Sequence, residues 1–220
     1  MNPKHAFWQA LFVTIIIFFL GIIIGFFLES FRSDKLGTTL INSEINLLDQ
    51  QLRENVIGNF NVSCNQAVNS SFVFADKIYS EARRLEDFDQ SSKFTETLFL
   101  LHKRYDLLRM MLWTESIKIK NQCKSTHNFH TVVYLYEYNT KEIDQVSKQK
   151  FFSRALSELK DKYPDKVLLI PIAADMDLES VNLAVNKYGI EKYPVIIIDE
   201  KKVIDNVITS EQLEKDVFSS

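Results

Sequence analysis

The residues from Phe7 to Leu28 form an apolar run that constrains every other part of the chain. The run contains no charged residue, and its only polar side chains are Gln9 and Thr14. Because a helix rises 1.5 Å per residue, about 20 such residues cross a hydrocarbon core of about 30 Å. The sequence therefore predicts a transmembrane helix over residues 7–28, preceded by a short N-terminal tail over residues 1–6.

A cleaved signal peptide is the alternative interpretation of this run. The run is longer than the apolar region of a usual signal peptide. No small-x-small cleavage site follows it, since the chain continues Phe26-Phe27-Leu28-Glu29-Ser30-Phe31. We therefore expect an uncleaved signal anchor and a single-pass membrane protein.

The membrane orientation has less support in the sequence. Lys4 precedes the apolar run and Arg32 and Lys35 follow it, so the basic residues do not favour a cytoplasmic N-terminal tail. Two N-x-S glycosylation triplets begin at Asn61 and Asn69. Together with the cysteine pairing described below, they favour a cell-membrane location with the C-terminal domains outside the cytoplasm.

Gly21 and Gly25 form a G-x-x-x-G pair within the predicted span. Small residues at this spacing let two membrane helices approach closely, which would allow a homodimer. Glycine is also frequent in membrane helices that do not associate. Both interpretations stay open.

The composition and motifs exclude several classes of function. The formal net charge of −3 gives no reason to expect a nucleic-acid partner. The chain has no Gly-rich phosphate loop, no paired-histidine metal motif and no nucleophile elbow. We therefore predict no catalytic residue, no bound cofactor and no metal, and we favour a non-enzymatic role.

Residues 36–123 have the pattern of a helical stalk. Its first helix carries apolar residues at alternating steps of four and three, which are Ile41, Ile45, Leu48 and Leu52. This stripe spans barely two heptads, so packing onto neighbouring helices is favoured over a self-standing coiled coil. Gly58 and the Asn-rich stretch after it are expected to end the helix.

Two further helices are expected over residues 65–85 and 92–120, joined by a polar turn at residues 86–91 into an antiparallel hairpin. Cys64 precedes the first arm and Cys123 follows the second. A disulfide would join the open end of the hairpin if their Cα atoms come within about 7 Å. Two unpaired cysteines are the alternative.

A zinc site formed by the cysteines and nearby histidines is another interpretation. Cys123, His127 and His130 lie within eight residues, and Cys64 could supply a fourth ligand. The spacing C-x3-H-x2-H matches no strong zinc pattern. A linker that contains two histidines is the favoured interpretation.

The sequence pattern of residues 129–220 differs from that of the helical stalk and predicts the element order β-α-β-α-β-β-α. Alternation up to the third strand predicts parallel crossovers, and the short turn at Lys201 predicts an antiparallel hairpin. Asn139 is expected to cap the first helix, with Glu142 in a capping-box position. Gly189 is expected to end the second helix in a left-handed conformation. The expected strands are 131–138, 167–173, 194–199 and 203–207. The first expected helix follows Asn139 and ends near Lys162, the second spans 178–188 and the third spans 211–218.

Within this domain, Lys187-Tyr188-Gly189-Ile190 is followed by Tyr193-Pro194-Val195-Ile196-Ile197-Ile198. This segment and the order of elements resemble the thioredoxin-like fold family. The resemblance implies a mixed α/β domain over residues 129–220 in which Tyr193–Pro194 is a cis peptide that opens a central strand. It does not extend to the membrane helix or the helical stalk.

The sequence departs from that family at the redox site. Thioredoxin-like oxidoreductases carry C-x-x-C where the first strand meets its helix, but residues 138–144 of this chain contain no cysteine. Without a redox site, the resemblance still implies a groove beside Pro194, because members of that family bind extended peptides at this place. Tyr136, Tyr138 and Tyr193 could line that groove, or they could pack only around the strand ends.

The sequence thus predicts a membrane-anchored scaffold whose redox-inactive thioredoxin-like domain binds a polypeptide. One alternative is a membrane-bound thiol–disulfide redox protein that uses Cys64 and Cys123. The other is a structural protein that dimerises in the membrane through Gly21 and Gly25.

Overall fold

The computed structural model describes residues 3–91, 95–123 and 128–219. The chain divides into two compact units, residues 1–48 and 49–220, and the boundary lies inside helix α1 (Pro3–Asn59). The predicted division was different, with a stalk over residues 36–123 and a separate domain after it. The boundary lies at residue 48 because the two helices that follow α1 pack with the sheet and belong to the same unit.

The first unit contains the apolar part of α1. In the described part of the chain, one helix is long and apolar enough to cross a membrane. Its segment Leu11–Leu28 has a mean hydropathy of 3.1, and the side chains of this segment are exposed. This matches the predicted span by length and composition.

The expected packing of the α1 stripe onto neighbouring helices is wrong. Ile41, Ile45, Leu48 and Leu52 are 52–63% exposed, whereas Gln50 is only 1% exposed. Gln50 faces inward because its side-chain amide donates a hydrogen bond to the buried carboxylate of Glu115. A buried polar contact therefore sets the inner face of this helix.

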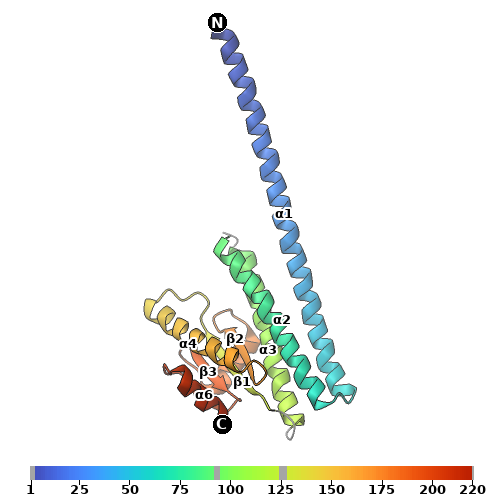
Figure 1. The fold of residues 1–220 in the computed structure, drawn as a ribbon, viewed down its shortest axis with the longest axis vertical. Coiled ribbons are helices and arrows are strands. Elements are labelled where there is room, and N and C mark those ends of the chain that lie inside the picture. The colour runs from blue at the N-terminus through green and yellow to red at the C-terminus, as the bar shows by residue number, and fades with distance from the viewer. Residues whose placement is uncertain (1–2, 92–94, 124–127, 220) are drawn as a thin grey trace. The chain divides into compact units, whose positions relative to one another are not determined.

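Helices α2 (Cys64–Ser91) and α3 (Thr95–Gln122) pack side by side and form the expected hairpin (Figure 1). The predicted turn at residues 86–91 is wrong, because α2 continues through Ser91. That stretch contains no Gly or Pro to stop a helix. The buried apolar residues of the pair include Phe74, Ile78, Leu98, Leu101, Leu108 and Leu112.

The sheet has four strands in the order β2-β1-β3-β4. Its strands are β1 (His130–Tyr136), β2 (Val167–Ala173), β3 (Val195–Ile198) and β4 (Lys202–Ile204). β1 and β2 are parallel, while β3 is antiparallel to both β1 and β4. The antiparallel β3–β4 hairpin is confirmed.

The predicted parallel crossover into the third strand is wrong. Val195, the first residue of β3, pairs with Leu135 near the C-terminal end of β1. Helix α5 (Glu179–Tyr188) has only ten residues and leads the chain back to the end of the sheet that it left. Gly189 ends α5 with a φ of 63°, as predicted.

Helices cover both faces of the sheet. α4 (Ile143–Lys162) and α6 (Ser210–Phe218) pack on one face, where Phe152, Leu156 and Leu213 join the core. α3 contacts β1, β2 and α5. The second unit is therefore one body in which the stalk helix α3 is part of the α/β core.

The predicted capping box at Asn139 differs from the structure. Asn139 forms no capping box, because α4 begins at Ile143 with Glu142 as its N-cap and without a side-chain capping bond. Within β2, Pro171 lies opposite Tyr134, and β2 is an edge strand, where the missing N–H of a proline is tolerated.

Candidate functional site

The candidate site lies where β1 ends and β3 begins. The Tyr193–Pro194 peptide is cis, and Pro194 is buried. Proline can precede β3 because a residue at the start of a strand does not need to donate to the ladder. Since Val195 pairs with Leu135, this segment lies beside Tyr136.

The three predicted tyrosines reach this end of the sheet from two elements. Tyr136 and Tyr138 follow one another along the end of β1, and Tyr193 precedes β3. Tyr136 stacks on Tyr134 with 5.4 Å between ring centroids, and Tyr138 lies 4.3 Å from the ring of His102 on α3. These contacts leave Tyr136 and Tyr138 partly buried.

Two carboxylates lie near Tyr193. Burial raises the pKa of Tyr193, and the negative charges of Glu137 and Asp175 raise it further. Asp175 also holds the loop after β1, since it accepts hydrogen bonds from the backbone N–H groups of Tyr138 at 2.7 Å and Asn139 at 3.0 Å. Asp175 follows the end of β2 by two residues, and the parallel pairing of β1 with β2 brings it beside the loop after β1.

A buried ion pair lies on α3 near Tyr136. The guanidinium of Arg109 lies 2.9 Å from Oδ1 of Asp106, whose side chain is 1% exposed. Burial raises the pKa of Asp106 to about 6, against the opposing effect of Arg109. Burial also acts to lower the pKa of Arg109, but its interactions with Asp106 and Tyr136 outweigh burial and raise it. Residue type and spacing alone do not indicate this pair, because charged helix residues usually face solvent.

Among the described residues, neither a free thiol nor a metal-binding cluster is found at this end of the sheet. Residues 139–142, where the family carries its thiols, contain no cysteine. Among the described residues, no group of three or more His, Cys, Asp and Glu side chains could hold a metal ion. His127 of the considered zinc set lies outside the described residues.

Both cysteines are engaged elsewhere in the fold. Cys64 and Cys123 form a disulfide with a Cα–Cα distance of 5.7 Å, which joins the start of α2 to the end of α3. Cys123 is 5% exposed, and Cys64 is partly buried. The chain has no free thiol.

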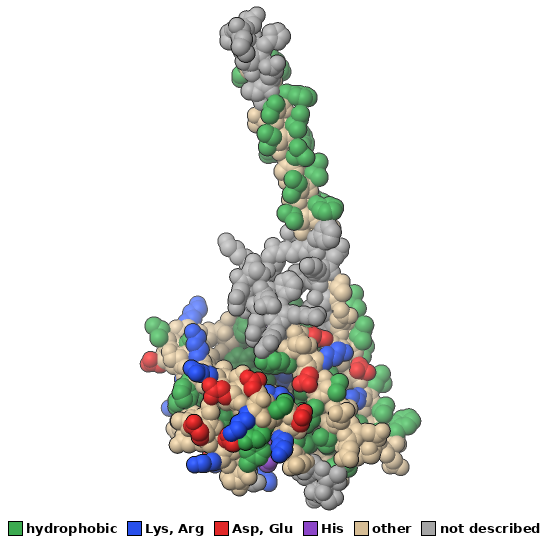
Figure 2. Space-filling view, viewed as in Figure 1, with side chains coloured by type: hydrophobic (Ala, Val, Ile, Leu, Met, Phe, Trp, Pro, Cys, Tyr) green, Lys and Arg blue, Asp and Glu red, His purple; other side chains and the backbone are tan. Residues whose placement is uncertain are grey.

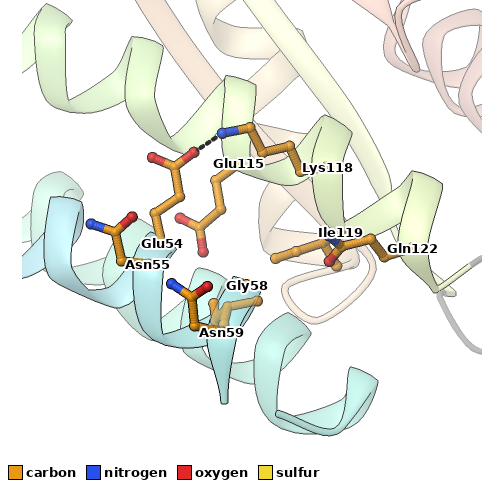
Figure 3. A pocket seen from close by; sticks show the side chains of 9 residues that line it. Glu54, Asn55, Gly58, Asn59, Glu115, Lys118, Ile119 and Gln122 are labelled. Atoms are coloured by element: carbon orange, nitrogen blue, oxygen red, sulfur yellow. Dashed lines mark hydrogen bonds and ion pairs between the residues drawn. The ribbon is translucent and has the colours of Figure 1, made fainter. Parts of the chain in front are cut away.

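A second polar region, missed by the sequence reasoning, lies between the last turns of α1 and α3 (Figure 3). It is a pocket of about 330 Å³ in which Lys118 pairs with Glu54. The carboxylate of Glu115 also lines it and pairs with Arg53. Since each charged side chain has an opposite charge beside it, this region holds α1 to α3.

On the face drawn in Figure 2, acidic and basic side chains of the second unit are interspersed. No protein-family model matches the sequence, and no curated protein matches it. The functional interpretation therefore rests on the residues and geometry of the chain itself.

Proposed function

We propose that this chain is a single-pass, membrane-anchored scaffold whose thioredoxin-like C-terminal domain binds an extended polypeptide without redox chemistry. The observation that carries the proposal is that Tyr136 and Tyr138, at and after the end of β1, and Tyr193, before β3, lie at the same end of the sheet as Pro194. The same place has no cysteine. Binding is the function that remains for a site of this kind.

The thioredoxin-like assignment of the domain has two supports. The strand order β2-β1-β3-β4, with β3 and β4 antiparallel to their neighbours, follows the β-α-β-α-β-β-α order of elements. α4 and α6 pack on one face of the sheet, while α5 lies with α3. No motif of a competing α/β family is present in the sequence.

The anchor and its orientation have separate supports. The apolar segment Leu11–Leu28 supports insertion in a membrane. The disulfide between Cys64 and Cys123 supports an oxidising compartment for the second unit, because the cytosol keeps most thiols reduced. We therefore place residues 49–220 outside the cytoplasm.

The chemistry of the site favours particular polypeptides. Tyrosine rings offer large contact areas with a polar end that can bond to a peptide backbone. Glu137 and Asp175 place negative charge beside Tyr193, which favours a bound segment with a basic residue. The preferred ligand is an extended peptide that combines an apolar and a basic side chain.

Binding should be measured with the full chain in lipid nanodiscs and a library of unstructured fluorescent peptides. We expect Tyr193→Ala to weaken binding of the apolar–basic peptides about tenfold, and Tyr163→Ala, a partly buried tyrosine between α4 and α6, to leave it unchanged. Equal binding by the wild type and Tyr193→Ala would contradict the proposal. Reduction of insulin by the chain would contradict the proposal that its C-terminal domain has no redox activity.

The observed disulfide supports one second candidate, a redox protein in which Cys64 and Cys123 cycle between thiols and disulfide. Alkylation before and after treatment with a mild reductant separates the two. A structural bridge resists mild reduction, whereas a catalytic pair becomes alkylated and reoxidises.

A further inference from the structure

The pocket between the last turns of α1 and α3 contains a carboxylate oxygen that no other described group satisfies. Glu115 is 1% exposed and lines the pocket. Arg53 and Gln50 both donate to its Oε2 atom, whereas its Oε1 atom is buried and accepts no hydrogen bond from the described residues. Figure 3 shows this carboxylate pointing from α3 towards the end of α1. A buried acceptor without a donor is unfavourable, so a donor from outside the chain would stabilise this site.

The pocket has room for more than one water molecule. Its volume of about 330 Å³ lies at the lower end of the roughly 300–1,000 Å³ that small-molecule sites occupy. Among its lining residues, Ile57 and Ile119 are apolar, and Asn55, Asn59 and Gln122 carry carboxamides. A pocket with one buried acceptor, two apolar residues and several amides suits a short aliphatic molecule with a polar end.

The charges around the pocket favour a cation as that polar end. Glu115 pairs with Arg53, and Glu54 pairs with Lys118. Asp49, one turn before Arg53 on α1, is a third carboxylate whose charge acts on Arg53. These three carboxylates are met by only two cations, so one negative charge is left over. Burial raises the pKa of Glu115 against the opposing effect of Arg53, and the negative charge of Glu54 raises it further.

We propose that this pocket binds a small aliphatic ammonium compound whose –NH₃⁺ group donates a hydrogen bond to Oε1 of Glu115. An ammonium group supplies both the missing donor and the missing positive charge, and charge-assisted hydrogen bonds are roughly twice as strong as neutral ones. A hydroxyl group would supply the donor alone, and a carboxylate would supply neither. The site is separate from the peptide site at Tyr193, so this inference does not rest on the proposed function.

Isothermal titration calorimetry of the full chain in phosphatidylcholine nanodiscs tests the site, with empty nanodiscs as the blank. The probes are putrescine and 1,4-butanediol, which share a carbon chain and differ in whether ammonium or hydroxyl groups end it. We expect putrescine to bind roughly tenfold more tightly than 1,4-butanediol. Equal binding of the two probes would overturn the proposal, because the pocket would then recognise an uncharged donor. Binding of neither probe would leave only water as the occupant and would also overturn it.

Two leucine substitutions on α1 show whether putrescine occupies this pocket. Gly58 lines the pocket, and a Cβ atom added there would meet no atom within 4 Å, so Gly58→Leu adds bulk without a clash. Replacing a helical glycine also favours the helix, which keeps the variant folded. Gln51→Leu adds the same side chain at an exposed position outside the pocket lining. We expect Gly58→Leu to weaken putrescine binding roughly tenfold and Gln51→Leu to leave it unchanged, and equal binding by the two variants would overturn the proposal.

Lys118 provides a test that a merely structural pocket would not pass. Lys118→Gln removes the positive charge beside Glu54 and keeps a polar side chain at a largely exposed position, where the loss of an ion pair affects stability little. The freed charge of Glu54 should then attract the ammonium group, so we expect putrescine to bind about threefold more tightly to this variant. Unchanged or weaker binding would show that the pocket does not select positive charge and would overturn the proposal.

Discussion

The ammonium group of Lys120 on α3 lies 2.6 Å from Oδ1 of Asp199, in the turn between β3 and β4. The same carboxylate oxygen accepts a hydrogen bond from the backbone N–H of Thr131 at 2.9 Å, and Oδ2 lies 2.6 Å from Nδ1 of His130. Asp199 and Glu200 both have positive φ angles, 48° and 60°. One carboxylate thus joins the end of α3, the start of β1 and the β3–β4 turn, which explains why the helical hairpin and the sheet form one unit.

Replacing Asp199 should destabilise the protein in a pH-dependent way. Burial acts to raise the pKa of Asp199, but hydrogen bonds from His130 and Lys120 outweigh burial and hold the pKa well below its usual range. A carboxyl group with a depressed folded pKa stabilises the fold above its unfolded pKa of about 4 and loses that effect as the pH falls further. Asp199→Asn removes one of the two carboxylates beside the partly buried Lys120 and leaves Glu200 at 3.3 Å, so we expect a loss of about 1.5–3 kcal/mol at pH 7.

The measurement is the free energy of unfolding of the full chain in detergent from pH 7 to pH 3. The difference between wild type and Asp199→Asn should shrink below about pH 4. Asp205→Asn, at an exposed position after β4, serves as the matched control. A constant difference across this pH range would show that the carboxylate charge is not the cause.

Removing the disulfide should lower stability through the unfolded chain. Cys64 and Cys123 are 59 residues apart, and closing a loop of that length restricts the unfolded state by about 4 kcal/mol. We expect the double variant Cys64→Ala/Cys123→Ala to unfold at a lower denaturant concentration, with a free energy of unfolding that is lower by about 4 kcal/mol. A reductant should shift the wild type in the same direction and leave the double variant unchanged; a shift of both would point to another cause.

Replacing Tyr188 with phenylalanine should not destabilise the protein. Within the described residues its hydroxyl is buried without a hydrogen-bond partner, while its ring stacks on Trp113 at 6.0 Å. Removing an unsatisfied polar atom while keeping the ring should leave stability equal or raise it by about 1 kcal/mol. Tyr105→Phe is the control, because the hydroxyl of Tyr105 donates to Glu81 at 3.3 Å and its loss should cost about 1 kcal/mol. Thermal unfolding of both variants compares them directly.

Whether the G-x-x-x-G pair brings two membrane helices together can be tested with a substitution that does not disturb the fold of one chain. A Cβ atom added at Gly21 or Gly25 would meet no atom within 4 Å. We expect Gly21→Ile to leave the fold intact and to weaken crosslinking between membrane segments if this pair brings two helices together. Ile24→Val is the control. Unchanged crosslinking in Gly21→Ile would exclude a glycine-mediated contact.

Predictions that depended on local sequence agree with the structure more often than those that depended on distant partners. β2 spans Val167–Ala173 as expected, and Gly189 has the left-handed conformation that its position after α5 required. The capping box was expected at Asn139 but occurs at Thr209 with Gln212. Asn139 instead donates its backbone N–H to Asp175, 36 residues later, so a tertiary contact replaced the local one.

At the candidate site, too, local patterns identified some residues, and tertiary contacts alone identified others. The sequence identified Tyr193 and Pro194, because a proline before an apolar β-branched run is visible locally. It did not identify Asp106 and Arg109, whose pairing depends on their burial in α3 near Tyr136. Their helical positions alone resemble those of solvent-exposed charges.

The sequence by itself determined the apolar span, the order of helices and strands, and the absence of cysteine at the family's thiol position. These features follow from residue type and short-range periodicity. Only the tertiary structure decided that β3 runs antiparallel to β1 and which side of α1 faces inward. The side of α1 depends on Gln50 and Arg53 reaching Glu115, 65 and 62 residues later in the chain. Hydrophobic periodicity predicts the opposite side, because it does not register a buried charge that needs a partner.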